Sequence, residues 1–322
     1  MGMQGFSKEF RDPVHYILDI TERIWEGRGV ELIRDWYAAD GPVRTPHGRT
    51  DDVEKVIEGT RATLLAFPDR ELLGEDVVIG QKNPGFYSSH RVRSTATHLG
   101  EGSFGPATGK PMTMLTIADC LCRDNQVVDE WLVRDQAGIA LQLGIDPRVM
   151  GRSMGGGAPE SYVAEEMVER WSDPAGLTVE GDAALAEKAV EAYRALFESN
   201  DPDTMATTHD RALRHEGLSS ALNYGRARPG ALLKQMFDAM PNGRFIPHHA
   251  IGVSEPGRPP RVSLRWSYIA RHAGDGRYGD ATNVDLALLG ISQFEFREDR
   301  ILNEWMVTDE LSIHAQIAAA GK

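Results

Sequence analysis

Two kinds of side chain that can transfer protons, histidine and aspartate, recur in this chain at one fixed spacing. His98 is followed 174 residues later by His272, and Asp135 is followed by Asp309 in the same way. Burial in an apolar pocket raises the pKa of a carboxyl group, whereas a nearby imidazolium lowers it. A dry pocket that holds one acid and one base can move a proton next to a carbonyl group. The pairs His98–Asp135 and His272–Asp309 are therefore the candidate catalytic residues, with aspartate as the base and histidine as its orienting partner or as the acid.

Strand periodicity indicates how each pair could meet. Successive side chains of a strand point to opposite faces, so His98 ends the apolar-leaning face of Val92 and Ala96, and Asp135 shares a face with Trp131. If both faces line one cavity, an imidazole and a carboxylate enter it together. The alternative is structural: the histidine and the aspartate cap the strand and the terminal helix and bond to each other.

The fixed spacing belongs to an internal repeat. The stretch HRVRSTATHLGEGSFGPATG, from His90, aligns without a gap with LRWSYIARHAGDGRYGDATN, from Leu264. The same shift aligns IADCLCRDNQVVDEWLVRDQ with ISQFEFREDRILNEWMVTDE and pairs Glu130 with Glu304. A period this long is that of a domain rather than of a solenoid repeat. The chain is therefore predicted to be a duplicated unit.

In each unit, helical periodicity precedes strand periodicity. Helices are expected in DPVHYILDITERIWEG and DDVEKVIEGTRATLLAF, and strands in FYSSHRVRSTATH, MTMLTIADCLCR and QVVDEWLVR. Helices segregated from consecutive strands indicate an α+β architecture. A Gly-Gly-Gly-Ala-Pro run marks the division. We predict a first unit over residues 1–146, a linker with a short helix over 147–180, and a second unit over 181–322.

The segments THLGEGSFGPATGK and DEWLVRDQAGIALQLG resemble the SnoaL-like polyketide cyclases, within the superfamily of nuclear transport factor two and ketosteroid isomerase. The resemblance implies two tandem cone-shaped α+β barrels, in which a curved, mainly antiparallel sheet wraps around N-terminal helices and a deep, largely apolar pocket. It also implies an intramolecular pseudo-dimer of the two units, with a further homodimer possible. The family's acid/base aspartate falls at Leu132 and Met306, which cannot transfer a proton.

Four further side chains are predicted to contact a ligand. Trp131 and Trp305 are candidates for the pocket wall. His47 follows a proline in a loop that the resemblance places near the pocket mouth, and His215 is its looser counterpart, since TPHG resembles RHEG. Upstream of the strands, the register of the repeat slips by a residue or more.

Composition and motifs exclude several classes of function. The net charge of −13 is spread over both halves, which argues against a nucleic-acid partner. No apolar stretch is long enough for a membrane span, and no signal sequence begins the chain, so a cytoplasmic location is expected. No His, Cys or carboxylate cluster has metal-ligand spacing, so no metal is expected. GEGSFG and GDGRYG match the dinucleotide pattern, but they join two strands rather than a strand and a helix, and no cofactor is expected.

The sequence thus predicts a small-molecule-binding protein that carries out cofactor-free acid/base chemistry (isomerisation, cyclisation or hydrolysis) on a small, mostly apolar metabolite. A non-catalytic binding or assembly module of the same fold is the alternative. The first unit is the better candidate for a catalytic site, because Val92 and Ser94 are small where the second unit has Trp266 and Tyr268.

Overall fold

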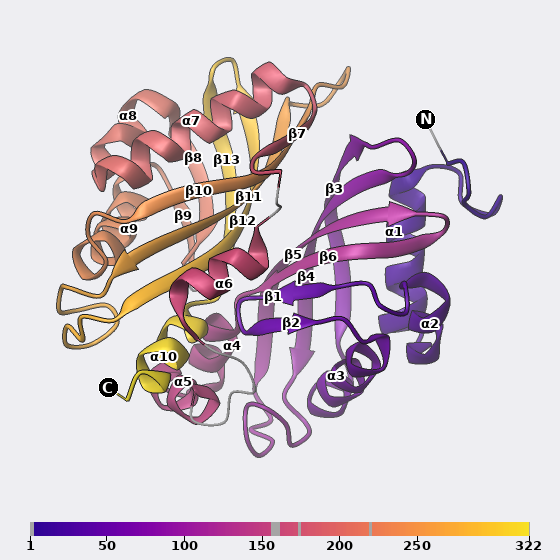
Figure 1. Ribbon diagram of the computed structural model, residues 1–322, viewed down its shortest axis with the longest axis horizontal. Helices are drawn as coiled ribbons and strands as arrows, with labels where there is room; N and C mark the ends of the chain where they lie inside the picture. The colour runs from indigo at the N-terminus through magenta and orange to yellow at the C-terminus, as the bar shows by residue number, and fades with distance from the viewer. Residues whose placement is uncertain (1–2, 156–161, 173–174, 219–220, 322) are drawn as a thin grey trace. The chain divides into compact units, whose positions relative to one another are not determined.

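The computed structural model describes residues 3–155, 162–172, 175–218 and 221–321 (Figure 1). Contacts divide the chain into two compact units. Unit 1 comprises residues 1–134 and 138–145, and unit 2 comprises residues 135–137 and 146–322. Each unit contains one sheet and its own helices, so the predicted α+β class in tandem is confirmed.

Unit 1 begins with helices and ends with four long strands. Its elements are α1 (Pro13–Thr21), the π-helix η1 (Glu22–Glu26), η2 (Val30–Leu32), α2 (Ile33–Trp36), β1 (Val43–Thr45), β2 (Gly48–Thr50), α3 (Val53–Ala66), β3 (Glu71–Gln81), β4 (Phe86–Thr97), β5 (Pro111–Arg123), β6 (Gln126–Arg134) and α4 (Gln136–Leu143).

The sheet of unit 1 has the order β2-β1-β6-β5-β4-β3. Strands β3 to β6 pair antiparallel, whereas β1 pairs parallel with β6. The expectation of a barrel was wrong in one respect, because the described strands β2 and β3 remain the two unpaired edges and the curved sheet does not close.

Helix α1 covers the inner face of this sheet, packing on β3 and β4. Asp12 caps it by accepting a hydrogen bond from the His15 backbone N–H, and Pro13 stands where a helix needs no N–H donor. The buried side of the helix presents Tyr16, Ile17 and Ile20 to the sheet. Removing these side chains from water is the main stabilising contribution to this layer.

Unit 2 repeats the plan. Its elements are α5 (Pro147–Gly155), α6 (Ala164–Trp171), β7 (Thr178–Gly181), α7 (Ala183–Ser199), η3 (Pro202–Thr204), α8 (Met205–Thr208), β8 (His209–Gly217), β9 (Ala221–Tyr224), α9 (Ala227–Ala239), β10 (Arg244–Val253), β11 (Arg261–Arg271), β12 (Asp285–Arg297), β13 (Arg300–Thr308) and α10 (Glu310–Ala319). Its sheet has the order β7-β10-β11-β12-β13-β8-β9, and α7 packs on β10 and β11 (Figure 1).

The segment expected to be a linker belongs structurally to unit 2 where it is described. Helix α5 packs on α10, and α6 packs on β11 and β12. Met167 and Trp171 of α6 are almost completely buried. The Gly-rich run itself, residues 155–157, lies almost entirely outside the described residues. No helix among the described residues is both long and apolar enough to cross a bilayer.

Candidate functional site

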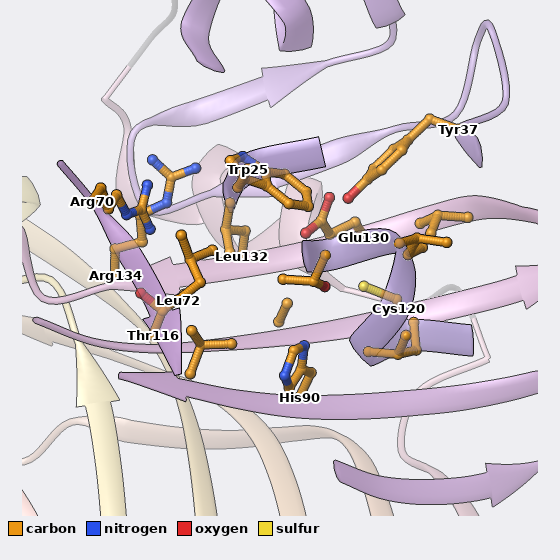
Figure 2. Close-up of a pocket in the computed structure, with 16 residues that line it drawn as sticks. Trp25, Tyr37, Arg70, Leu72, His90, Thr116, Cys120, Glu130, Leu132 and Arg134 are labelled. Carbon is orange, nitrogen blue, oxygen red and sulfur yellow. The ribbon is translucent and has the colours of Figure 1, made fainter. Parts of the chain in front are cut away.

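A cavity of about 70 Å³ lies inside unit 1, between α1, η1 and the inner face of the sheet (Figure 2). Much of its wall is apolar, formed by Ile17, Ile20, Trp25, Leu72, Val92 and Leu132. Trp25 reaches the cavity from the π-helical turn that follows α1. Such turns widen a helix locally and are frequent at functional sites. The charged side chains of the wall lie at two ends of the cavity.

Glu130 occupies one end of the cavity. It is 5% exposed, and the Tyr37 hydroxyl donates a hydrogen bond to its carboxylate (Figure 2). Burial raises the pKa of Glu130 to about 7, although the charge of Arg134 and the hydrogen bond from Tyr37 oppose the rise. A carboxyl group with this pKa is divided between its acid and base forms at neutral pH, as general acid/base catalysis requires.

Arg70 and Arg134 lie at the opposite end of the cavity (Figure 2). Arg70 is 5% exposed, and its Nε and Nη2 atoms both donate to the Ser94 hydroxyl, at 3.1 and 3.0 Å. Burial lowers the pKa of Arg70 to about 9, and the positive charges of Arg134 and Arg28 lower it further. Arg70 nevertheless remains protonated at neutral pH.

His90 and Cys120 line the wall between these ends. Burial lowers the pKa of His90 to about 4, so its imidazole is neutral at pH 7. Its Nε2 atom is buried and has no hydrogen-bond partner among the described residues. Burial raises the pKa of the Cys120 thiol well above its ordinary value, which makes it a poor nucleophile.

A β-bulge turns Glu130 inward. Cys122 pairs with Val127 and Leu121 pairs with Asp129, which leaves one extra residue in β6. An extra residue reverses the alternation of side chains that follow it. Val127 and Glu130 therefore both face the cavity, and Leu132 and Arg134 continue that face.

The predicted pair His98 and Asp135 is absent from the residues that line this cavity. His98 shares the inner face of β4 but lies beyond its end, where its Nδ1 atom is hydrogen-bonded to the Thr108 hydroxyl at 3.2 Å. The ring also lies against Phe67, with ring centroids 5.2 Å apart. Asp135, 4% exposed, follows the end of β6. The structure does not bring the two together in the cavity, and their catalytic role stays a prediction.

The second pair has the same local structure. His272 Nδ1 is hydrogen-bonded to the Thr282 hydroxyl at 2.9 Å, as His98 is to Thr108. Asp309 caps α10, accepting from the Leu311 backbone N–H at 3.1 Å and from the Gln136 side chain at 2.9 Å. Each histidine thus forms a hydrogen bond to the loop that follows its strand. Asp309 caps a helix, which is the role that the structural alternative in the sequence analysis gives it.

The two tryptophans stack on arginines. The Arg44 guanidinium lies 4.4 Å from the ring of Trp131, and that of Arg214 lies 5.2 Å from the ring of Trp305. Trp131 alternates with the cavity-lining residues of β6 and is absent from the cavity wall. A role for either tryptophan in binding a ligand therefore stays a prediction without support from this cavity.

His47 and His215 occupy different places. His47 is half-buried in the turn between β1 and β2, outside the cavity wall. His215 lies in β8, paired with Glu304, where unit 1 pairs Val43 with Glu130. Strand pairing thus makes His215 the counterpart of Val43 and corrects the loose match with His47. His215 is 1% exposed, and its Nε2 lies 4.0 Å from Glu304.

In unit 2 the matching region is packed with aromatic rings and a polar network. Tyr193 Oη donates to Glu304 at 2.5 Å, and His209 Nε2 lies 3.1 Å from the same carboxylate. Burial opposes ionisation of Glu304, but its electrostatic interactions with His215 and His209 and the hydrogen bonds from His209 and Tyr193 lower its pKa to about 2. Trp266 and Phe294 complete the packing, each almost fully buried.

Comparison with known proteins identifies the family. The sequence profile described as SnoaL-like polyketide cyclase matches residues 15–143 and again residues 187–317. The chain belongs to the SnoaL-like polyketide cyclase family. No curated protein matches it significantly.

Solved structures match this tandem SnoaL-like protein one unit at a time. IdmH from Streptomyces antibioticus, described as a candidate polyketide cyclase, is 26% identical, with a TM-score of 0.37 over 42% of this chain and 100% of its own. A candidate polyketide cyclase from Acidithiobacillus ferrooxidans is 21% identical, with a TM-score of 0.35 over 40% of this chain and 92% of its own. AclR from Streptomyces galilaeus, described as a candidate hydroxylase, is 23% identical, with a TM-score of 0.34 over 40% of this chain and 92% of its own.

Sequence reasoning missed Glu130, although the repeat contained a signal for it. Glu130 and Glu304 are paired by the ungapped alignment, each in an apolar strand. Leu132, where the resemblance puts the family's aspartate, lines the cavity. Among the described residues, no three His, Cys, Asp or Glu side chains are grouped so that they could hold a metal ion.

Proposed function

We propose that unit 1 of this SnoaL-like protein is a cofactor-independent enzyme site in which Glu130 moves a proton next to a carbonyl group of a small metabolite. The observation that carries this proposal is a buried carboxyl group with a pKa of about 7 in the wall of a mainly apolar cavity. Perturbed carboxyl groups in clefts are typical of acid/base sites.

The reaction class that fits is an isomerisation through an enolate. The Glu130 carboxylate accepts a proton from the carbon beside the carbonyl, and the C–H electron pair moves into the enolate. In a substrate with a carbon–carbon double bond next to that carbon, the enolate extends over the double bond. The resulting carboxylic acid then returns the same proton to the far carbon of the double bond, so no other reactant is consumed. Tyr37 holds the carboxylate in place. The neutral imidazole of His90 can donate a hydrogen bond to the carbonyl oxygen, where negative charge develops.

The size of the cavity limits the substrate. A volume of about 70 Å³ is well below the roughly 300–1,000 Å³ of sites for drug-sized ligands. The metabolite is therefore compact, with an apolar body that fits against Ile17, Ile20 and Leu132.

A non-catalytic binding module is the second candidate, favoured by Leu132 and Met306 at the place where the family resemblance puts its aspartate. If the protein is such a module, the Glu130→Gln variant binds its ligand as well as wild type does. If the protein is an enzyme that uses Glu130 as its base, the Glu130→Gln variant no longer turns its substrate over.

Proton exchange separates the two candidates. In D₂O, wild-type protein should catalyse deuterium incorporation into at least one of three enolisable probes: butanone, cyclohexenone and α-ketobutyrate, followed by NMR. Glu130→Gln should lower that rate by about 10²- to 10⁴-fold. Glu58→Gln, the same change at an exposed residue of α3, is the matched control and should exchange at the wild-type rate. A folded Glu130→Gln protein that exchanges as fast as wild type would overturn the proposal.

A further inference from the structure

Arg70 lies at the cationic end of the unit 1 cavity. The guanidinium of Arg70 is 5% exposed, and its side-chain hydrogen bonds go to the neutral Ser94 hydroxyl. Within the described part of the chain, no carboxylate forms an ion pair with Arg70. The charges that act on it are those of Arg134 and Arg28, which have the same sign.

A buried cation without an anionic partner is costly, because removing it from water is unfavourable and arginine does not escape by losing its proton. Ser94 supplies one acceptor to a group with five N–H donors. The remaining donors are suited to an oxyanion that arrives with a ligand. Arginine forms paired, parallel hydrogen bonds with carboxylates, which gives such a contact both strength and orientation.

The internal repeat shows that the fold does not require this arginine. Aligning AFPDR with AMPNG places Gly243 where unit 1 has Arg70. Tyr268 stands where unit 1 has Ser94, and its hydroxyl accepts a hydrogen bond from the Gly243 backbone N–H at 3.0 Å. A side chain at position 243 would collide with the Tyr268 ring, since a Cβ there would lie 2.2 Å from it. The Tyr268 ring of unit 2 therefore occupies the space that corresponds to the Arg70 side chain of unit 1.

We propose that the substrate of unit 1 carries one anionic group, a carboxylate, which Arg70 and Arg134 bind. This inference rests on the proposed function, in which Glu130 acts on a C–H bond at the other end of the cavity. The two ends then set the orientation of a compact oxo-carboxylate. In this orientation the carboxylate lies against the arginines and the acidic carbon faces Glu130. Figure 2 shows the arginines and Glu130 at separate parts of the cavity wall. A neutral ketone of the same size lacks the group that fixes this orientation.

Two isosteric probes test the charge requirement: α-ketobutyrate and its uncharged amide, α-ketobutyramide. Binding to the full chain is measured by calorimetry and by the shift in thermal melting, at matched ionic strength. The carboxylate should bind wild-type protein about 10- to 100-fold more tightly than the amide, the difference expected when a buried charged hydrogen-bond pair is lost. Equal affinity for the two probes would overturn the proposal.

Variants then locate the site. Arg70→Met should abolish the preference for the carboxylate, and Arg228→Met, at an exposed arginine in unit 2, should leave it unchanged. Because a buried substitution can disturb folding, Arg70→Lys provides a second measurement. It keeps the charge but loses the paired geometry, so the preference should fall by about tenfold. An unchanged preference in a folded Arg70→Met or Arg70→Lys protein would overturn the assignment.

Glu130→Gln distinguishes this inference from the proposed function. It should bind α-ketobutyrate at least as tightly as wild type does, because a negative charge has been removed from the cavity, while its deuterium exchange is lost. Exchange of butanone that depends on Glu130, with no preference for the carboxylate, would refute the anion site alone. A carboxylate preference that depends on Arg70, with exchange unaffected by Glu130→Gln, would refute the proposed catalysis alone.

Discussion

The two units keep the same buried glutamate and give it opposite properties. In unit 1, Glu130 borders a cavity, and burial raises its pKa to about 7. In unit 2, Glu304 sits among Tyr193, His209 and His215, and its pKa is lowered to about 2. The fold thus provides the position, and the neighbours decide between a group that can exchange protons and one that remains ionised.

The difference extends to the neighbouring positions. Val92 in unit 1 corresponds to Trp266 in unit 2, and Cys120 corresponds to Phe294. Trp266 is fully buried, and its indole Nε1 donates to Ser292 at 3.0 Å. Unit 2 resembles a structural copy in which large rings and a satisfied polar network occupy the space that unit 1 leaves for a ligand.

The largest effect should come from breaking the unit 2 network. Glu304→Gln removes the carboxylate that is hydrogen-bonded to Tyr193 and His209, and each hydrogen bond to a buried charged group contributes about 1.5–3 kcal/mol to the free energy of unfolding. Calorimetric unfolding at pH 7 measures this loss. Glu130→Gln is the matched change in unit 1 and should cost nothing at this pH. Equal destabilisation by the two variants would contradict the comparison.

Exchanging the paired wall residues should give the next largest effect. Trp266→Val leaves a hole in unit 2 and should lower the free energy of unfolding by about 3 kcal/mol. Val92→Trp should instead fill the unit 1 cavity, at a cost of roughly 1–3 kcal/mol. Val92→Trp should also abolish the binding of α-ketobutyrate, whereas Trp266→Val should retain it. Binding that survives Val92→Trp would place the ligand site elsewhere.

The two glutamates should also give opposite dependences of stability on pH. Because folding raises the pKa of Glu130 from its ordinary value of 4.5 to about 7, the folded state holds more protons between these values, and stability falls as pH rises through this window. Glu130→Gln should remove that loss and gain up to about 3 kcal/mol over wild type above pH 7. Glu304 behaves in the opposite sense, contributing stability above pH 4.5 that is lost as the pH falls towards 2.

Urea unfolding of wild type and Glu130→Gln across this pH range tests the sign. The rate of deuterium exchange provides a second measurement, since a general base with this pKa should make kcat/KM rise with pH and level off above about 7. A wild-type protein that becomes more stable between pH 5 and 7, relative to Glu130→Gln, would rule out the raised pKa.

The repeat allowed much of the fold to be predicted from the sequence, and far less of the site. Ungapped pairs such as His98 with His272 lie in matching local structure, because loop geometry depends on nearby residues. The inner face of β6 could not be identified in the same way. Alternation groups Trp131 with Asp135, but it does not say which face is inside, and the bulge before Asp129 reverses the alternation. Tyr37 and Arg70 come from segments where the register slips, so only the folded chain places them in the same cavity wall as Glu130.

The smallest effect is expected at the residues with the strongest sequence signal. Asp135→Asn should change the rate of deuterium exchange by less than about twofold, because Asp135 does not line the cavity and asparagine keeps a similar shape. Asp309→Asn should lower the free energy of unfolding by about 1 kcal/mol or less, since asparagine also caps helices well. Both deuterium exchange and thermal melting are measured in each variant. A structural role lowers the melting temperature, whereas a catalytic role lowers the rate of exchange. A loss of exchange in Asp135→Asn as large as that in Glu130→Gln, without a change in melting, would make Asp135 the base and Glu130 its neighbour. The repeat would then preserve these aspartates for chemistry in one unit and for helix capping in the other.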